Sequence, residues 1–203
     1  MKAEAIHLLK KPLKTDLNDP VKNKNLWGAL TEAGEEDTIL MIATGVRLIR
    51  GDSFMALVND RDERVDYYVS IKEFNIHGRP AVFQSLVWRN RASIFVKARD
   101  GYASFASFVF FEYLLPQKGF IIVSDNEQTE AGQSFWLLRL SEAFDKGYRA
   151  YVVQTKKNNQ VVGEIPDFAS VAPIVDKIWG DKKHHLRIII SKEAAFDTKK
   201  IKT

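Results

Sequence analysis

The sequence predicts an α/β protein with a mixed sheet, in which an antiparallel meander is followed by the order β-α-β-α-β. One observation is the meander itself: apolar residues recur at every second position from Val65 to Ile71, the period-2 pattern of a half-buried strand. The other lies in residues 119–136, where a short apolar run, a polar turn and a helical pattern follow one another directly. Strands grouped first and then alternating with helices indicate a mixed α/β fold.

The first half of the chain predicts an extension and a set of short strands. Residues 1–37 are expected to form an N-terminal extension, with a short helix over 26–30 and with Asn18-Asp19-Pro20 as a turn. In this extension Trp27 is interpreted as a side chain that packs into the hydrophobic core. A single domain is expected over 38–190. The expected strands of its first half are 38–42, 46–49, 54–58, 65–72, 81–88 and 92–96.

The second half predicts the alternating part of the fold. A nearly all-apolar helix is expected over 104–115, stopped by Pro116 and Gly119, and a strand over 120–123. A second helix is expected over 129–146, with a buried side made of Phe135, Trp136, Leu138, Leu140, Ala143 and Phe144. Later signals predict strands at 148–153, 161–162 and 186–190, a helix within 166–179, and a basic tail at 191–203.

Composition excludes several classes of protein. The chain has 203 residues and no cysteine, so a disulfide framework, a thiolate nucleophile and a cysteine zinc site are excluded. With four histidines, two of them adjacent, we expect no metal. The motifs of a serine hydrolase elbow, a P-loop and a dinucleotide-binding turn are missing. No apolar run reaches the ~18 residues of a membrane span, and we expect a cytoplasmic protein without a membrane partner.

The net charge of +4 is mild, and lysines at both ends of the chain supply much of it. Two interpretations stay open. The terminal lysines are solvated and have no partner, or together with Arg89, Arg91 and Lys97 they bind nucleic acid through its phosphates. Binding of the second kind would weaken steeply with salt.

Two motifs resemble those of the GNAT family of N-acetyltransferases. The predicted strand at 92–96 runs into Arg99-Asp100-Gly101-Tyr102-Ala103, which looks like a degraded form of the family's glycine turn. Further on, Ser124-Asp125, Gln128-Thr129, Gly132 and Trp136 follow the order seen in a phage-associated GNAT-like group. The resemblance covers roughly residues 50–155. It implies that Arg99, Gly101, Tyr102 and Ala103 hold the pyrophosphate of acetyl-CoA or another acyl-CoA at a helix N-terminus.

The same resemblance implies an acyl transfer from acyl-CoA to an amine acceptor. Asp125 or a bound water would be the base, and Tyr148 or Tyr151 the proton donor to the leaving thiolate. Ser124 and Asn126 would contact the acceptor. A purely structural interpretation competes with this one, because the residues from Ser124 to Thr129 also fit the capping chemistry of a helix start.

An alternative function follows from the damaged turn, which holds one glycine instead of two. The chain would then be a catalytically degenerate GNAT-like phage protein that acts by binding a host protein or nucleic acid. The acceptor's identity and this choice both stay open at the level of sequence.

Overall fold

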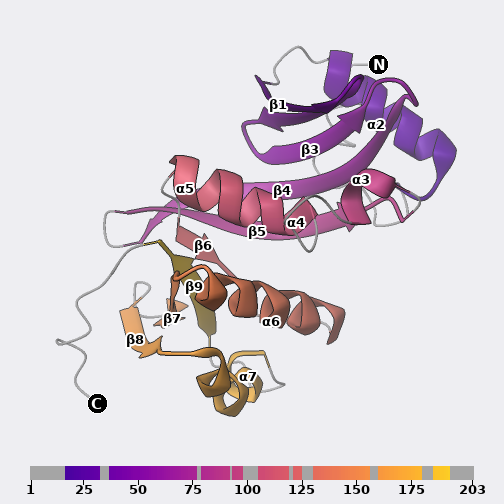
Figure 1. The fold of residues 1–203 in the computed structure, drawn as a ribbon. Helices are drawn as coiled ribbons and strands as arrows, with labels where there is room; N and C mark the ends of the chain where they lie inside the picture. Colours follow the sequence, from indigo (N-terminus) through magenta and orange to yellow (C-terminus); the bar gives the residue numbers. More distant parts are fainter. Residues whose placement is uncertain are drawn as a thin grey trace. The chain divides into compact units, whose positions relative to one another are not determined.

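A computed structural model shows the fold and describes residues 17–32, 37–76, 79–91, 93–97, 105–118, 121–124, 130–155, 160–179 and 185–192 (Figure 1). The chain divides into two compact units. The first unit is Met1–Lys72 with Ser85–Phe105, and the second is Glu73–Gln84 with Ala106–Thr203. The general α/β class predicted from the sequence is confirmed, and most strand pairs are antiparallel.

The predicted meander is present. Its strands are β1 (Asp37–Ala43), β2 (Val46–Gly51), β3 (Phe54–Asn59), β4 (Arg64–Ile76) and β5 (Arg79–Arg89). The pairs β1–β2, β2–β3 and β3–β4 are all antiparallel. Strand β4 begins in the first unit and ends in the second, and β5 begins in the second unit and ends in the first, so each strand belongs to both units.

Strand β4 is not half-buried as its alternation predicts. Every residue from Val65 to Val69 is buried, including the carboxylate of Asp66, which pairs with Arg64 (Nε–Oδ1 2.8 Å). The register with β3 shifts between Leu57 and Val58, which marks a bulge at this point. Because both faces of the strand are covered here, the period-2 pattern does not separate an inner from an outer face.

Helix α2 (Pro20–Glu32) is longer than the predicted segment. Asn18 lies in a turn as predicted, but Pro20, the last residue of the predicted turn, is the first residue of the helix. Asp19 Oδ1 accepts hydrogen bonds from the N–H groups of Val21 (3.0 Å) and Lys22 (3.1 Å). An aspartate N-cap followed by proline at the first helical position is a strong start signal, since that proline needs no hydrogen-bonding partner.

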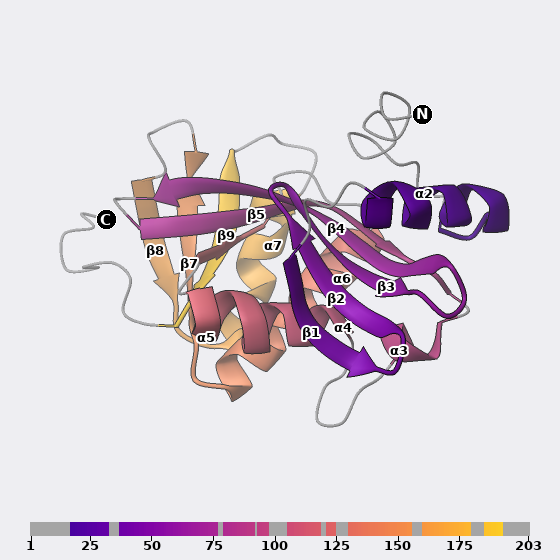
Figure 2. The ribbon, with the colours of Figure 1, turned by 90° about the horizontal axis from the view of Figure 1, so that it is seen from above.

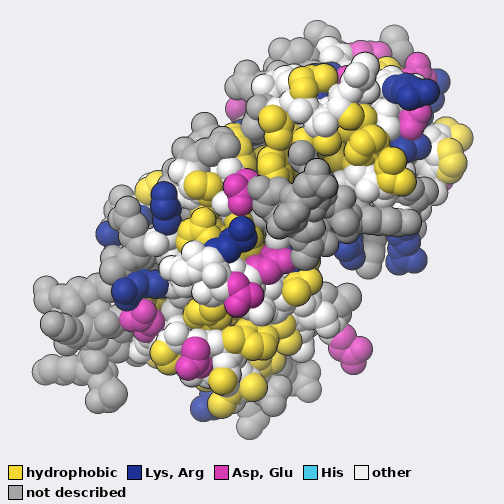
Figure 3. All heavy atoms as spheres, viewed as in Figure 1, with side chains coloured by type: hydrophobic (Ala, Val, Ile, Leu, Met, Phe, Trp, Pro, Cys, Tyr) yellow, Lys and Arg dark blue, Asp and Glu magenta, His cyan; other side chains and the backbone are white. Residues whose placement is uncertain are grey.

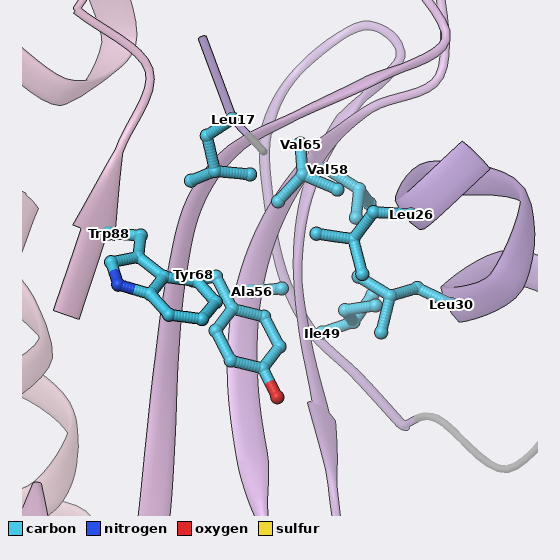
Figure 4. Close-up of a cluster of buried hydrophobic side chains, with 9 residues drawn as sticks. All are labelled: Leu17, Leu26, Leu30, Ile49, Ala56, Val58, Val65, Tyr68 and Trp88. Carbon is cyan, nitrogen blue, oxygen red and sulfur yellow. The ribbon is translucent and has the colours of Figure 1, made fainter. Parts of the chain in front are cut away.

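Helix α2 packs its apolar side on the strands of the first unit, and the buried cluster it completes is drawn in Figure 4. The cluster consists of Leu17, Leu26, Leu30, Ile49, Ala56, Val58, Val65, Tyr68 and Trp88. The ring of Tyr68 stacks against Phe54 and against Trp88, at centroid distances of 5.6 Å each. Burial raises the pKa of Tyr68 to about 12, so its hydroxyl stays neutral.

The prediction of a strand at 92–96 is wrong. Strand β5 ends at Arg89 and is followed by a short helix, α3 (Ile94–Lys97). Buried Ser93 explains the change, because its Oγ accepts a hydrogen bond from the Phe95 N–H at 3.2 Å. A serine that binds the backbone ahead of it favours a helix start over a continued strand.

The second unit contains the alternating part. One continuous helical segment consists of α4 (Phe105–Phe108), the π-helix η1 (Val109–Leu114) and α5 (Leu115–Lys118), as Figure 2 shows. Pro116 therefore does not stop the helix where the sequence predicts. The remaining elements are β6 (Ile121–Val123), α6 (Glu130–Asp145), β7 (Arg149–Gln154), β8 (Gln160–Ile165), the 3₁₀ turn η3 (Phe168–Ser170), α7 (Ala172–Trp179) and β9 (Leu186–Ser191).

The strands of the second unit follow the order β5-β6-β9-β7-β8. Strand β6 runs parallel to β5, with Ala81 opposite Ile121 and Phe83 opposite Val123. Strand β9 lies antiparallel to both β6 and β7. Consequently β6 and β7 run in the same direction, and their carboxyl ends lie at the same edge of the sheet.

Helix α6 confirms the predicted helix over 129–146, with one correction. Trp136, Leu140 and Ala143 are buried as predicted, but Leu138 is 50% exposed and Arg139 is only 1% exposed. Hydrophobic side chains are visible over α6 and α7 on the face drawn in Figure 3. The buried face of α6 therefore differs from the predicted one: it leaves out Leu138 and includes the cationic side chain of Arg139.

Candidate functional site

The sequence predicts a binding site at the carboxyl end of β6. Of the residues predicted to line it there, the structure describes Ser124. Ser124 is fully buried. Its N–H donates to the Ile188 carbonyl (2.8 Å), and its Oγ accepts from the Ile188 N–H (2.9 Å). The side chain thus extends the pairing of β6 with β9 by one residue. Asp125 and Asn126, the predicted base and acceptor contact, lie outside the described residues.

The predicted cofactor residues also lie outside the described part of the chain. Arg99, Gly101, Tyr102 and Ala103 fall between α3, which ends at Lys97, and α4, which begins at Phe105. Their role therefore stays a prediction.

Tyr151, one of the two predicted proton donors, lies in β7 and is fully buried. It belongs to a cluster of apolar side chains in the second unit, whose other members are Ile76, Ala81, Val123, Val153, Val161 and Ile189. In the register, Tyr151 and Val123 both lie opposite Ile189, one on each side of β9. Tyr151 is therefore level with the last residue of β6, within the packed layer.

Tyr148, the other predicted donor, precedes β7 and lies toward the opposite edge. Ser124 bonds to Ile188, and Ile188 pairs with Val152, four residues after Tyr148. Four residues of extended strand span about 13 Å. The structure therefore does not bring Tyr148 and Ser124 together.

Tyr148 instead contacts the π-helix η1. Its hydroxyl donates to the Phe111 carbonyl at 3.5 Å, and the two rings stack at 5.5 Å. Burial, and then the negative charge of Glu112, raise the pKa of Tyr148, so the phenol remains a hydrogen-bond donor at neutral pH. Beside it, Lys146 Nζ lies 3.5 Å from Glu112 Oε1.

A buried polar cluster between α4 and α6 was missed by the sequence analysis. Arg139 Nη2 lies 3.1 Å from Glu142 Oε1, and Ser107 Oγ donates a hydrogen bond to Glu142 Oε2. The Arg139 guanidinium also lies over the Phe135 ring, 5.4 Å from its centroid. The i, i+3 spacing of Arg139 and Glu142 is the signal that could have found it. Charge is balanced within the cluster, which suits it to join two helices.

In the first unit, one polar cluster surrounds Asp60. Trp27 Nε1 donates to its Oδ1 (3.0 Å) and Arg47 Nε to its Oδ2 (2.8 Å). Partial burial alone would raise the pKa of Asp60, but the hydrogen bonds from Arg47 and Trp27 outweigh it and lower that pKa. Trp27, interpreted from sequence as a core plug, is partly buried and also anchors α2 to the turn after β3.

Two classes of feature are missing from the described ranges. Among these residues no group of three or more histidine, aspartate or glutamate side chains is placed to hold a metal ion. Within the same ranges, no helix has both the length and the apolar character needed to cross a membrane.

Comparison with known proteins gives no relative. No protein-family model matches the chain, and no curated protein or solved structure is significantly similar to it.

Proposed function

We propose that the chain is a GNAT-like acyltransferase that moves an acyl group from acyl-CoA to an amine acceptor. The amine would attack the thioester carbonyl directly and form an amide bond, with Asp125 as the base that takes the amine's proton. The C–S bond would break, and CoA would leave as a thiolate that takes up a proton. Arg99, Gly101, Tyr102 and Ala103 would hold the cofactor's phosphates. The class of the acceptor is open in this proposal.

The observation that supports the proposal is the parallel pair β5–β6 in the second unit. Its register runs from Ala81–Ile121 to Phe83–Val123, and Val123 is the last residue of β6. A helix precedes β6 and α6 follows it, so the order strand, helix, strand, helix, strand is present. In open α/β sheets, ligands bind at the carboxyl ends of such strands, and Asp125 and Asn126 come directly after this one.

A binding protein with a GNAT-like fold is the second candidate, and a specific observation favours it. Two of the predicted site hydroxyls serve the fold: Ser124 Oγ bonds to the β9 backbone, and the Tyr148 hydroxyl bonds to η1. Only one glycine stands in the predicted phosphate turn. Such a protein would act by engaging a host protein, or nucleic acid through exposed Arg89 and Arg91 and the terminal lysines.

Isothermal titration of the full chain with acetyl-CoA tests the proposal. We expect saturable binding by the wild type and its loss in Gly101→Glu, because a carboxylate would repel the phosphates. The matched control is Gly163→Glu, since a Cβ at Gly163 in β8 meets no atom within 4 Å. Equal binding by both variants would show that acetyl-CoA does not bind at Gly101. No binding by the wild type would favour the second candidate.

Nucleic-acid binding is tested separately by retention on DNA and RNA at increasing salt. Binding through phosphate contacts would fall steeply with salt concentration. Retention that does not change with salt would exclude the phosphate-binding form of the second candidate.

A further inference from the structure

Strand β1 begins the sheet order and lies at the edge of the strands of the first unit (Figure 1). Among the strands that the structure describes, β2 is its one neighbour. The other long side of β1 therefore presents backbone N–H and carbonyl groups that no described strand pairs with. From Thr38 to Ala43 the strand contains neither a charged residue nor a proline, the residue types that commonly protect an edge from further pairing. An edge of this composition is a template for another strand.

Two neighbouring apolar side chains of β1 are exposed. Leu40 is 36% exposed and Met41 is 57% exposed, whereas neighbours in a regular strand point to opposite faces. The register with β2 shifts on each side of this pair, between Thr38 and Leu40 and between Met41 and Ala43. Bulges re-aim side chains, and they also shorten the edge with which another strand can pair. Pairing at β1 is therefore expected to be short and weak.

Strand β8 stands at the other end of the sheet order and has a different composition. Glu164 in β8 pairs with Arg149 of β7 (Oε1–Nη1 3.1 Å). Gly163 precedes this charge, and a glycine inside a strand weakens pairing because it brings no side chain to pack. Val162 is 48% exposed, similar to the exposed residues of β1. Strand β1 is therefore the edge better suited to pairing, and Val162 offers a comparison of similar exposure.

The start of β1 is acidic. Glu35 and Glu36 directly precede the strand in the sequence, and Asp37 is its first residue. In the register of β1 with β2, Arg50 lies opposite Asp37, so one of the three acidic residues has a basic residue beside it. The other two, Glu35 and Glu36, make the segment that leads into β1 acidic.

The end of β1 lies next to a turn that carries Arg61. The Asp60 N–H donates to the Gly45 carbonyl (2.7 Å), and a Cβ at Gly45 would lie 3.4 Å from the Arg61 Cβ. Arg61 is exposed. The three carboxylates of the same turn are each paired with a cation, in the ion pairs Asp60–Arg47, Asp62–Arg64 and Glu63–Lys24. Arg61 therefore adds a positive charge at this end of the strand.

We propose that β1 is a dimerisation edge, at which a second copy of the chain adds its own β1 antiparallel, about a two-fold axis through Leu40. Leu40 is the middle residue of β1, so this axis pairs it with Leu40 of the second copy and places Asp37 opposite Ala43 of that copy. The acidic residues before Asp37 then come next to the second copy's turn at Gly45, beside its Arg61. Because a two-fold interface is isologous, the same match of charges occurs at both ends of the pair. A parallel pair would instead bring the two acidic starts together.

Disulfide cross-linking at single introduced cysteines tests the dimer, because the full chain has no cysteine of its own. Directly opposite residues of antiparallel strands have Cα atoms about 4.5–5.5 Å apart, a separation that a disulfide spans. With a mild oxidant, Leu40→Cys should therefore form the cross-linked dimer at least about tenfold faster than the matched control Val162→Cys, which reacts only through collisions in solution. Equal rates, or faster cross-linking of Val162→Cys, overturn the proposal.

Sedimentation velocity of the full chain, from micromolar to millimolar concentration, tests the match of charges and leaves Leu40 intact, so it decides if Leu40→Cys does not fold. The wild type should form a reversible dimer and no larger species, since a two-fold interface closes. Arg61→Glu should raise the dissociation constant at least about tenfold, because like charges then meet at both ends. Adding Glu35→Lys and Glu36→Lys to Arg61→Glu restores opposite charges and should return the constant to within about threefold of the wild type.

Three outcomes of the sedimentation test would overturn the proposal. One is a wild-type chain that stays monomeric at millimolar concentration. Another is a triple variant that dimerises as weakly as Arg61→Glu alone. The third is growth beyond the dimer that Val162→Lys prevents, because β1 of one copy would then pair with β8 of the next in an open chain.

Discussion

Asn23 is a buried polar residue that joins α2 to the strands of the first unit. Its side chain is 2% exposed. Its Nδ2 donates to the carbonyls of Leu17 (2.8 Å) and Val65 (3.0 Å), and its Oδ1 accepts from the Val65 N–H (2.6 Å). The side-chain amide of Asn23 thus pairs with both the N–H and the carbonyl of Val65, as the backbone of a neighbouring strand would. Asn23→Ala removes all three bonds and leaves buried backbone groups unpaired.

We expect Asn23→Ala to lower the free energy of unfolding by about 3 kcal/mol, from about 1 kcal/mol for each of the three hydrogen bonds. In urea this corresponds to a midpoint about 1 M lower at a slope of about 3 kcal/mol per M. The assay is urea unfolding followed by tryptophan fluorescence, to which Trp27 and Trp88 of the first unit and Trp136 and Trp179 of the second unit contribute.

Asn25→Ala is the matched control, because Asn25 is an exposed asparagine on the same helix. Alanine has the higher helix propensity, so this variant should be neutral or slightly more stable. If Asn23→Ala loses less than about 1 kcal/mol, the buried amide contributes no more than a single ordinary hydrogen bond, and the reasoning is refuted.

Two further variants test the first unit and its acid stability. Gly51→Ala should cost about 1 kcal/mol in thermal unfolding, because the new Cβ would lie 2.2 Å from the Phe54 ring and break its stack, whereas Gly163→Ala should be neutral. Asp60→Asn should flatten the acid limb of the stability curve. The lowered pKa of Asp60 stabilises the fold above its unfolded value of 3.8, and this contribution is lost as pH falls through the folded pKa. An unchanged acid limb would show that the contact with Arg47 has no effect on folding.

Strands and long helices could be predicted where the apolar pattern matched one structural period. Strand β7 and helix α6 were found within one or two residues, since each pairs a clear pattern with a clear end signal. Helix α2 was predicted too short, because Asp19-Pro20 is a turn signal and a helix-start signal at once. Local sequence does not choose between them, and the packing of Leu26 and Leu30 in the core does.

Positions set by tertiary contacts could not be predicted. The apolar pattern of α6 placed Leu138 on the buried side and did not include Arg139. In the structure Leu138 is exposed, and Arg139 is buried and paired with Glu142. Ser124 was identified as a site residue from its place after a strand, but its hydroxyl bonds to a strand more than sixty residues away. Whether Asp125 and Gly101 form a site stays a prediction.

Binding of acetyl-CoA to the full wild-type chain is the measurement that tests the proposed function most directly. A GNAT-like acyltransferase predicts saturable heat in the titration that disappears in Gly101→Glu and persists in Gly163→Glu. No heat from a folded wild-type chain, at acetyl-CoA concentrations up to the millimolar range, would contradict acyl transfer from acetyl-CoA.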